Sequence, residues 1–277
     1  MREIIANVQV NIPCTMLSEG YLHLFMTNGL NPEIGIDAAA LDRFTPDDHL
    51  SLATEFREAG RRITLHGPFM DLSPGSPDPS ILKISRQRLQ QMTDLVQDYH
   101  PAAVVCHAGY DPTRYAFCRE EWLATATETW SRTAEAVSRA GSRLVLENVY
   151  EHHPDEMAPL MEALSPYGVG LCLDIGHLTV FGQSTLKEWL HRLGGYIRHL
   201  HLHDNRGKHD DHMAMGNGTI EMDPLFTYLA ADVCSPLIVT LEPHREPDLW
   251  ASLRYLSSRL PRDSAGLSVL PAAPEIS

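Results

Sequence analysis

The sequence predicts an α/β protein: a single closed (β/α)8 TIM barrel with a metal site at the mouth where the strands end. Short apolar runs of strand type alternate with amphipathic helical patterns along the whole 277-residue chain. Several runs finish in a histidine or a carboxylate, as expected where barrel strands carry functional residues at their C-terminal ends. An open doubly wound sheet is the structural alternative. Closure is favoured because the polar strand ends are spread through the chain, and only a closed barrel brings them around one centre.

The expected strands and helices alternate from the N-terminus onward. Strands are expected at residues 4–12, 32–37, 63–69, 103–108, 143–149, 168–175, 197–203 and 237–243. Helices are expected at residues 22–27, 47–59, 79–99, 120–140, 155–164, 185–193, 224–231 and 247–260. Thr45, followed by Pro46 and two aspartates, has the residue types of a helix N-cap. One domain over residues 1–260 follows, with a loose C-terminal tail over residues 261–277 that is rich in Pro, Ala and Ser.

The composition indicates which binding partners and which cellular compartment to expect. The formal charge is −14 and no Lys/Arg cluster is present, so nucleic acid is not expected as a partner. The five cysteines have no C-x-x-C spacing, and Cys106 and Cys172 lie inside apolar runs, which indicates reduced thiols and a reducing compartment. Neither a signal-peptide pattern nor an apolar stretch of about 18–20 residues is present. We therefore expect a cytoplasmic protein without a membrane partner; the sequence leaves its oligomeric state open.

Polar side chains mark six of the strand runs and the loops that follow them. Because residues two apart share one face of a strand, His199, His201 and His203 are expected to point into the barrel, with His199 deepest. A mixture of imidazoles and carboxylates at one barrel mouth suits Zn²⁺ or Mn²⁺. The candidate metal ligands are His66, His107, Glu147, Asp174, His177, His201, Asp210, His212 and Glu242.

Six short motifs resemble the xylose isomerase-like barrel superfamily, which includes endonuclease IV-type enzymes and many sugar isomerases and epimerases. The resemblance runs from His66 through Glu242 and so covers most of the chain. The motifs are His66-Gly-Pro-Phe69, Leu146-Glu-Asn148, Leu173-Asp-Ile-Gly-His177, His201-Leu-His-Asp204, Asp210-Asp-His212-Met-Ala-Met-Gly216-Asn-Gly218 and Leu241-Glu-Pro243.

The resemblance implies three groups of metal ligands, as in the trinuclear site of endonuclease IV-type enzymes. The groups are His66, His107 and Glu147; then Glu147, Asp174, His201 and Glu242; and then His177, Asp210 and His212. Glu147 would bridge the first two groups. In such a site Glu147 and Glu242 would be catalytic, holding a hydroxide that attacks a phosphorus atom. The implied cofactors are one to three divalent ions, Zn²⁺ or Mn²⁺.

Two departures from the endonuclease IV pattern bear on the reaction. His203 stands where those enzymes carry Asn, and the phrase His201-Leu-His-Asp-Asn205 is more similar to the sugar-phosphate isomerase/epimerase group. The chain also lacks the basic loops that an AP endonuclease needs to grip duplex DNA.

The favoured function is a multinuclear metallohydrolase that cleaves a phosphoester or phosphodiester in a small, phosphorylated metabolite. Cobamide-remodelling phosphodiesterases, which act on a nucleotide loop, are one such class in this superfamily. A mononuclear sugar or sugar-phosphate isomerase or epimerase, with Glu147 and Glu242 as the acid/base pair, is the alternative. DNA cleavage is the function that the charge supports least.

Five further residues are candidates for binding substrate or supporting the ligands: Asn11, Asp37, His203, Asp204 and Arg206. His203 and Asp204 could accept the second ring N–H of a metal-bound histidine. Arg206 could bind a substrate phosphate or be a solvated loop charge. Asn11 and Asp37 could contact substrate or cap a loop. Asn148 is expected to turn away from the site and bond the loop backbone.

Overall fold

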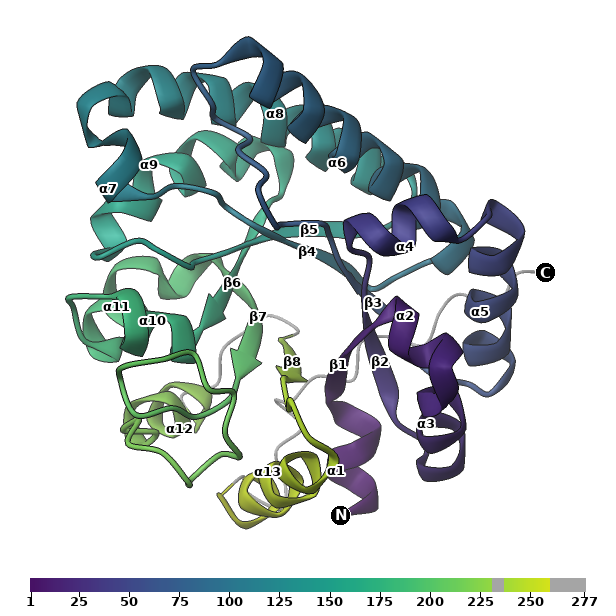
Figure 1. Ribbon diagram of the computed structural model, residues 1–277. Helices are drawn as coiled ribbons and strands as arrows, with labels where there is room; N and C mark the ends of the chain where they lie inside the picture. Colours follow the sequence, from purple (N-terminus) through teal and green to yellow (C-terminus); the bar gives the residue numbers. More distant parts are fainter. Residues whose placement is uncertain (231–236, 260–277) are drawn as a thin grey trace.

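The computed structural model describes residues 1–230 and 237–259 and contains the predicted closed barrel (Figure 1). Eight parallel strands pair in chain order, and β1 also pairs with β8. The strands are β1 (Gln9–Pro13), β2 (Asn31–Gly35), β3 (Thr64–His66), β4 (Ala103–His107), β5 (Arg143–Glu147), β6 (Gly170–Asp174), β7 (Ile197–Leu202) and β8 (Ile238–Leu241). The open-sheet alternative is therefore excluded, whereas the tail expected at 261–277 lies outside the described residues.

Helices surround the barrel as an outer layer (Figure 1). The long ones are α5 (Pro46–Glu58), α6 (Pro79–Tyr99), α8 (Arg119–Arg139), α9 (Pro154–Leu164) and α13 (Glu246–Arg259). The short ones are α1 (Arg2–Asn7), α2 (Cys14–Met16), α3 (Leu22–Asn28), α4 (Ala38–Arg43), α7 (Pro112–Tyr115), α10 (Ile175–Phe181), α11 (Leu186–Leu193) and α12 (Asp223–Ala230). Single turns of other helix types are η1 (Leu17–Tyr21), η2 (Ala116–Cys118), η3 (Ser165–Tyr167) and η4 (Gly194–Tyr196). In the described part of the chain, no helix is long and apolar enough to span a membrane.

The prediction of a strand at residues 4–12 is wrong in its first half, because residues 2–7 form helix α1. The side chain of Asn31, on β2, donates to the backbone carbonyls of Ile5, Ala6 and Val8 at 3.2–3.3 Å. These carbonyls lie at the C-terminal end of α1, where no intrahelical donor remains. A contact 23 or more residues away in sequence therefore ends the helix and lets β1 begin at Gln9.

The other expected strands also end one to three residues earlier than predicted, and two of them have a clear physical reason. The strand expected over 63–69 is only β3, since Gly67 and Pro68 follow His66 and Pro has no N–H for a ladder. The strand expected over 32–37 stops at Gly35, and Asp37 instead caps α4 by accepting the Ala40 N–H at 2.7 Å. Of the two roles considered for Asp37, the structure has it as a cap.

Alternation along the strands separates the barrel interior from the layer beneath the helices. Val105, Val145 and Cys172 form an apolar group of their own, two residues before His107, Glu147 and Asp174 respectively. The larger side chains, including Trp130 and Trp189, belong to the main core of the protein. The apolar group thus forms a layer in the barrel directly below the polar strand ends.

Two helices begin with a capping box, in which the N-cap residue and the third helical residue exchange hydrogen bonds. Thr45 and Asp48 form a reciprocal capping box at α5, as the Thr45-Pro46 pattern predicted, and Thr185 and Glu188 form another at α11. In the second box Glu188 accepts the Thr185 N–H at 2.6 Å, and Thr185 Oγ1 accepts the Glu188 N–H at 3.3 Å.

We expect Thr185→Ala to lower the free energy of unfolding by about 1 kcal/mol, because the Glu188 N–H loses its acceptor, Thr185 Oγ1, and the Glu188 carboxylate loses the hydrogen bond from that hydroxyl. Urea denaturation followed by circular dichroism measures this change. Thr185→Ser keeps the hydroxyl and is the matched control, expected within about 0.5 kcal/mol of wild type. Equal stability of wild type and Thr185→Ala would contradict the role of the box.

Candidate metal centre

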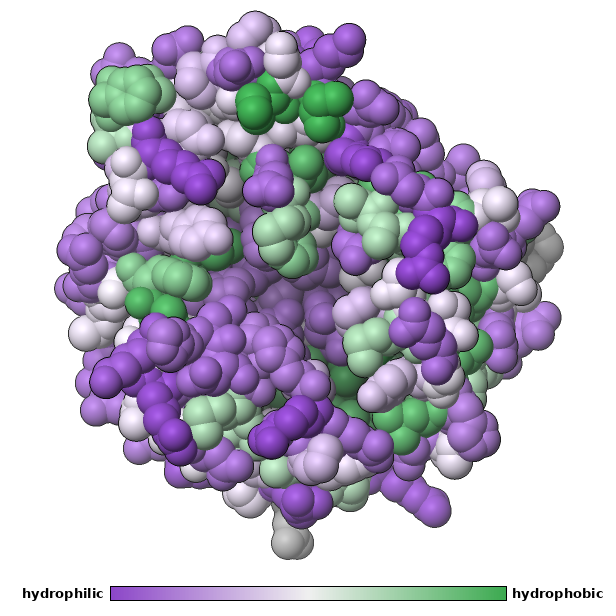
Figure 2. All heavy atoms as spheres, viewed as in Figure 1, coloured by the Kyte–Doolittle hydropathy of each residue, from purple (hydrophilic) through white to green (hydrophobic). Residues whose placement is uncertain are grey.

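Strands β3 to β8 end around a hollow lined with hydrophilic side chains, visible at the centre of the face in Figure 2. The nine side chains singled out from the sequence come together here. Their imidazole nitrogens and carboxylate oxygens form overlapping groups in which the ligand atoms lie within 4.8 Å of one another. The nine are His66, His107, Glu147, Asp174, His177, His201, Asp210, His212 and Glu242.

The first group lies at the ends of β3, β4 and β5. Glu147 Oε2 is 3.1 Å from His66 Nε2 and 3.6 Å from His107 Nε2. The other ring nitrogen of His66, Nδ1, lies 2.9 Å from the Gly67 carbonyl, so Nδ1 is a donor there and Nε2 is the ring atom that faces Glu147. A metal ion that displaced the Nε2 proton would have this nitrogen and the carboxylate as ligands.

The second group centres on His201 of β7, which is fully buried. Its Nδ1 lies 3.1 Å from Glu242 Oε1, 3.4 Å from Glu147 Oε1 and 3.9 Å from Asp174 Oδ2. Glu147 therefore uses one oxygen toward the first group and the other toward the second. A carboxylate in this position could bridge ions held by the two groups.

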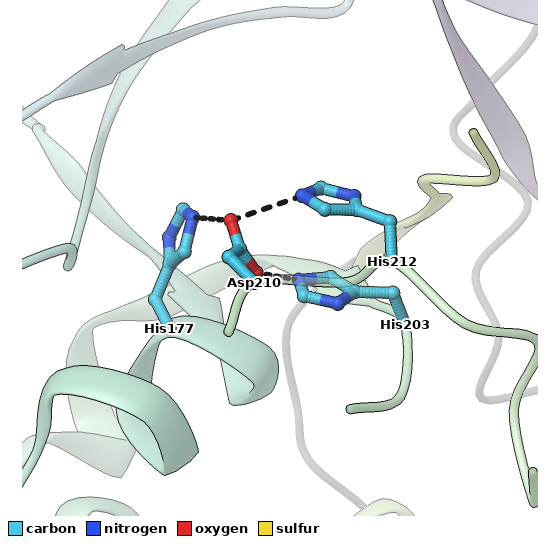
Figure 3. A group of neighbouring side chains, drawn as sticks. All are labelled: His177, His203, Asp210 and His212. Atoms are coloured by element: carbon cyan, nitrogen blue, oxygen red, sulfur yellow. Dashed lines mark hydrogen bonds and ion pairs between the residues drawn. The ribbon is translucent and has the colours of Figure 1, made fainter. Parts of the chain in front are cut away.

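The third, outer group joins α10 to the loop after β7 (Figure 3). Asp210 Oδ2 lies 3.3 Å from His177 Nε2 and 3.1 Å from His212 Nε2. The second ring nitrogens of both histidines bond backbone carbonyls, His177 Nδ1 to Asn148 at 3.1 Å and His212 Nδ1 to Glu242 at 3.0 Å. His212 also has a φ of 46°, a left-handed conformation that non-glycine residues adopt at a cost and that is enriched at functional sites.

Charge compensation dominates the electrostatics of the mouth. Burial works against ionisation of Glu147, but the imidazoles of His201 and His177 outweigh it and hold its pKa well below the usual range. Burial lowers the pKa of His107 to about 3, so this ring is neutral and available as a ligand. Burial also disfavours charge on His177, yet Asp174, Asp210 and Glu147 raise its pKa well above normal. A bound dication would take over that positive charge and release protons.

Several buried polar atoms at the mouth have no hydrogen-bond partner in the part of the chain that the structure describes, as is expected where a metal ion binds. Asp174 Oδ2, Asp210 Oδ1, His201 Nδ1 and both ring nitrogens of His203 are buried without a hydrogen-bond partner among the described residues. Such atoms are costly unless something compensates them. Imidazole nitrogens and carboxylate oxygens at these spacings are the donor types of Zn²⁺ and Mn²⁺ sites. The side chains therefore fit divalent metal ions.

Glu33 is the residue that the sequence analysis missed. It lies fully buried on β2, with Oε1 2.9 Å from His201 Nε2 and Oε2 3.2 Å from His199 Nε2. Thr64 and Thr240 donate their hydroxyls to Oε2 at 3.0 and 2.9 Å. Burial raises the pKa of Glu33, but His201 and His199 lower it well below the usual range. Glu33 thus faces Nε2 of His201 with a carboxylate oxygen, on the side of the ring opposite Nδ1 and the candidate metal ligands.

Glu33 was missed because it stands in the middle of a strand and not at its end. The available signal was a lone acid between Pro32 and Ile34 in an otherwise apolar run. Asn11, considered for substrate binding, donates to Glu33 Oε1 at 3.3 Å and so belongs to the same buried network. His199 lies deep in the barrel, as expected, 2.7 Å from Thr240 Oγ1.

Three other candidates lie in or beside the loop after β7. Asp204 was expected to support a metal-bound histidine, but it accepts the backbone N–H groups of Asn205, Gly216, Gly218 and Ile220 at 2.9–3.2 Å. It therefore holds in place the loop that carries Asp210 and His212. Arg206 is exposed on this loop and forms no ion pair within residues 1–230 and 237–259. His203 is buried and points its Nε2 between Asp174 and Asp210, at 3.4 and 3.6 Å.

Asn148 turns away from the ligands and pairs with the backbone of Asp174, as expected. Its Nδ2 donates to the Asp174 carbonyl at 3.0 Å, and its Oδ1 accepts the Asp174 N–H at 2.9 Å. These two bonds join the end of β5 to the end of β6. Glu147 and Asp174 are thereby fixed relative to one another.

The structural class is therefore a parallel eight-stranded barrel with a candidate multinuclear metal centre at the C-terminal ends of its strands. The sequence model described as "Xylose isomerase-like TIM barrel" matches residues 32–259, and the chain belongs to this family. The resemblance inferred from the six motifs is confirmed.

The individual relatives share 28% or less of their residues with this chain over the matched segments. MJ1311 of Methanocaldococcus jannaschii is 28% identical over 165 residues, which span 57% of this chain and only 56% of that protein. A probable endonuclease 4 of Mycobacterium ulcerans is 25% identical over 209 residues, 71% of this chain and 80% of the relative. Among solved structures, the TTHB071 protein of Thermus thermophilus, soaked with ZnCl2, has a TM-score of 0.75 at 27% identity, covering 91% and 97% of the two chains. A D-tagatose 3-epimerase-like protein has a TM-score of 0.77 at 21% identity, covering 91% and 96%, and shares the fold.

We expect Glu33→Gln to weaken metal binding by about 10–100-fold, because an amide removes the negative charge that faces Nε2 of His201 at 2.9 Å and Nε2 of His199 at 3.2 Å. Competition with a chromophoric chelator measures the affinity. Glu135→Gln, at an exposed position of α8, is the matched control. A Glu33→Gln protein that folds and binds metal as wild type does would contradict the role of Glu33.

Glu151, in the loop after β5, generates a prediction about pH and stability. It is buried; its Oε2 accepts the Val149 N–H at 2.8 Å, and its Oε1 has no partner among the described residues. Burial raises its pKa to about 7 from the 4.5 of an unperturbed Glu. The folded state thus binds the proton more tightly than the unfolded chain does. Glu151 therefore leaves the free energy of unfolding unchanged below pH 4.5 and lowers it increasingly as the pH rises to 7.

Glu151→Gln should therefore stabilise the protein at pH 8 by up to roughly 3 kcal/mol and change little at about pH 4.5, since one pKa unit corresponds to about 1.4 kcal/mol. Urea denaturation at about pH 4.5, 6 and 8 measures the difference. A stability difference that is the same at all three pH values would show that Glu151 keeps an ordinary pKa.

Proposed function

We propose that this protein is a divalent-metal-dependent hydrolase that cleaves a phosphoester or phosphodiester bond in a small metabolite. The observation that carries the proposal is the outer group of His177, Asp210 and His212, which adjoins the two inner groups through His177 Nδ1, 3.1 Å from Glu147 Oε1. An enzyme that only moves protons on a sugar needs one metal and gains little from a further cluster. Phosphoryl chemistry uses several ions to hold the attacking and leaving oxygens.

When bound, Zn²⁺ or Mn²⁺ ions lower the pKa of water and neutralise charge that develops on phosphate oxygens. His66, His107 and Glu147 would hold one ion, and Glu147, Asp174, His201 and Glu242 a second. His177, Asp210 and His212 would hold a third. The ligand sets are supported by the convergence of their donor atoms.

Glu147 and Glu242 are the proposed catalytic residues. Both lie close to His201 Nδ1, and both direct oxygens into the hollow. Glu147 has both oxygens engaged by imidazoles, so its role is to hold and orient a water molecule between the inner groups. Glu242 is the more exposed of the two, at 9%, and its Oε2 lies 3.8 Å or more from the nearest imidazole nitrogens. In this proposal Glu242 Oε2 accepts the proton of that water, which its distance from the imidazoles supports.

A small substrate suits the charge of the protein better than a nucleic acid does. The chain carries a net charge of −14, and repulsion from a phosphate backbone would oppose DNA binding, despite the similarity to a probable endonuclease 4. Phosphodiester metabolites, with a cobamide nucleotide loop among them, are the substrates to test. The unpaired Cys14, Cys106, Cys118 and Cys172 support a reducing compartment, and we propose the cytoplasm.

A sugar or sugar-phosphate epimerase is the second candidate. Glu147 and Glu242 approach the same atom, His201 Nδ1, at 3.4 and 3.1 Å, so one ion there would have a carboxylate on two sides. Such a pair can remove and return protons on opposite faces of an enediolate. The outer group would then bind substrate hydroxyls.

We expect protein purified without chelator to contain two or three equivalents of Zn²⁺ or Mn²⁺, and His212→Ala to lose one. Hydrolysis of bis(p-nitrophenyl) phosphate should fall by on the order of 100-fold or more in this variant, because charge stabilisation at the transition state is lost. Metal analysis by mass spectrometry and a colorimetric rate assay provide the two readouts. His209→Ala, three positions away and exposed, is the matched control.

A single equivalent that His212→Ala retains would argue against the hydrolase. Epimerisation of a ketose or ketose phosphate by the same sample would establish the second candidate in its place. Cleavage of an abasic DNA duplex at a rate above that of small phosphodiesters would instead overturn the choice of substrate.

A further inference from the structure

His203 is a buried histidine whose two ring nitrogens lack hydrogen-bond partners in the described structure. Its side chain is 1% exposed. Nε2 lies 3.4 Å from Asp174 Oδ1, 3.6 Å from Asp210 Oδ1 and 3.9 Å from Glu242 Oε2. An imidazole in a dry site, facing three carboxylates without bonding any of them well, has the position of a metal ligand and not of a packing residue.

The same Nε2 converges with the outer group. Ligand atoms of His177, His203, Asp210 and His212 all lie within 4.8 Å of one another, and Figure 3 shows the three imidazoles around the Asp210 carboxylate. The rings of His203 and His212 are stacked, with centroids 3.9 Å apart and planes 5° from parallel. Their in-plane lone pairs therefore run side by side, and a tilt of one ring would direct both Nε2 atoms at one ion.

Gly176 provides the space for this imidazole. A Cβ atom at Gly176 would overlap Cε1, Nε2 and Nδ1 of His203. Gly176 lies in helix α10 and has no left-handed φ, so its backbone does not require glycine. In a helix, glycine costs about 1 kcal/mol relative to alanine. The close approach of the His203 ring is the structural reason for a glycine here.

We infer that His203 is a fourth protein ligand of the outer ion, in addition to His177, Asp210 and His212. The inference rests on the proposed multinuclear centre. Three imidazoles and one carboxylate make a four-coordinate set, which suits tetrahedral Zn²⁺, and a substrate oxygen could enter as a fifth ligand. The outer ion would then be a zinc that secures the loop of Asp210 and His212 and supplies charge, while the inner groups would keep open positions for water and substrate.

The first test is retention of zinc during dialysis against increasing concentrations of a chelator. We expect His203→Asn to lose one equivalent at a free-zinc concentration about 100-fold or more above that of wild type, beyond the roughly 10–100-fold typical of an outer-shell change. His244→Asn is the matched control, because His244 is exposed and stacks on His212 at 4.0 Å. It should retain zinc as wild type does.

The second test uses Co²⁺ as a spectroscopic substitute for zinc. A tetrahedral Co²⁺ ion absorbs visible light far more strongly than a six-coordinate one, so its spectrum reports the ligand set without any assay of activity. We expect one strong tetrahedral spectrum in wild type and its loss in His203→Asn. Gly176→Ala, which leaves His203 in the chain but displaces its ring, should also lose it; circular dichroism checks that each variant is folded.

The outcomes separate this inference from the proposed function. Three equivalents in wild type, all retained by His203→Asn with an unchanged cobalt spectrum, overturn the assignment of His203 and leave the hydrolase intact. One equivalent in wild type, retained by His203→Asn, overturns both. Loss of one ion in His203→Asn, in a wild-type protein that hydrolyses no phosphodiester, supports the fourth ligand and rejects the hydrolase.

Discussion

The mouth of the barrel depends on one buried carboxylate, Glu147. It is 1% exposed, and its two oxygens face imidazoles from four places in the chain: His66, His107, His177 and His201. An ionised carboxylate in this environment is tolerated only because those partners surround it. In turn, the histidines are oriented around a shared centre because Glu147 occupies it. Removal of this single charge would leave several imidazoles without a common partner.

Around this centre, the fold supplies support at two depths. Below it, Glu33 holds His201 from the far side of the ring, and an apolar layer of Val105, Val145 and Cys172 closes the barrel. Above it, Asp204 binds four backbone amides of the loop that carries Asp210 and His212. Neither Glu33 nor Asp204 is itself a proposed ligand. Both hold the proposed ligands in position, and such supporting contacts give a metal site its defined geometry.

Membership of the xylose isomerase-like family establishes the fold and leaves the reaction open, since one barrel supports many chemistries through the residues at its mouth. The inner groups, with Glu147 and Glu242 on either side of His201, would serve hydrolysis and proton transfer equally well. The outer group is what distinguishes the two. His203, accommodated by Gly176, extends that group beyond the three residues expected from the resemblance.

The sequence by itself determined the barrel and the nine residues at its mouth, because strand periodicity shows which residues point inward and all parallel strands end at one rim. The tertiary structure decided what depends on contacts across the barrel or between distant segments. Asn31 ends α1 where a strand was expected, Glu33 meets His201 from another strand, and Asp204 bonds a loop and not a ligand. Periodicity specifies the face of a strand on which a side chain lies. It does not specify which side chain from another strand will lie opposite, and that pairing is set only when the barrel closes.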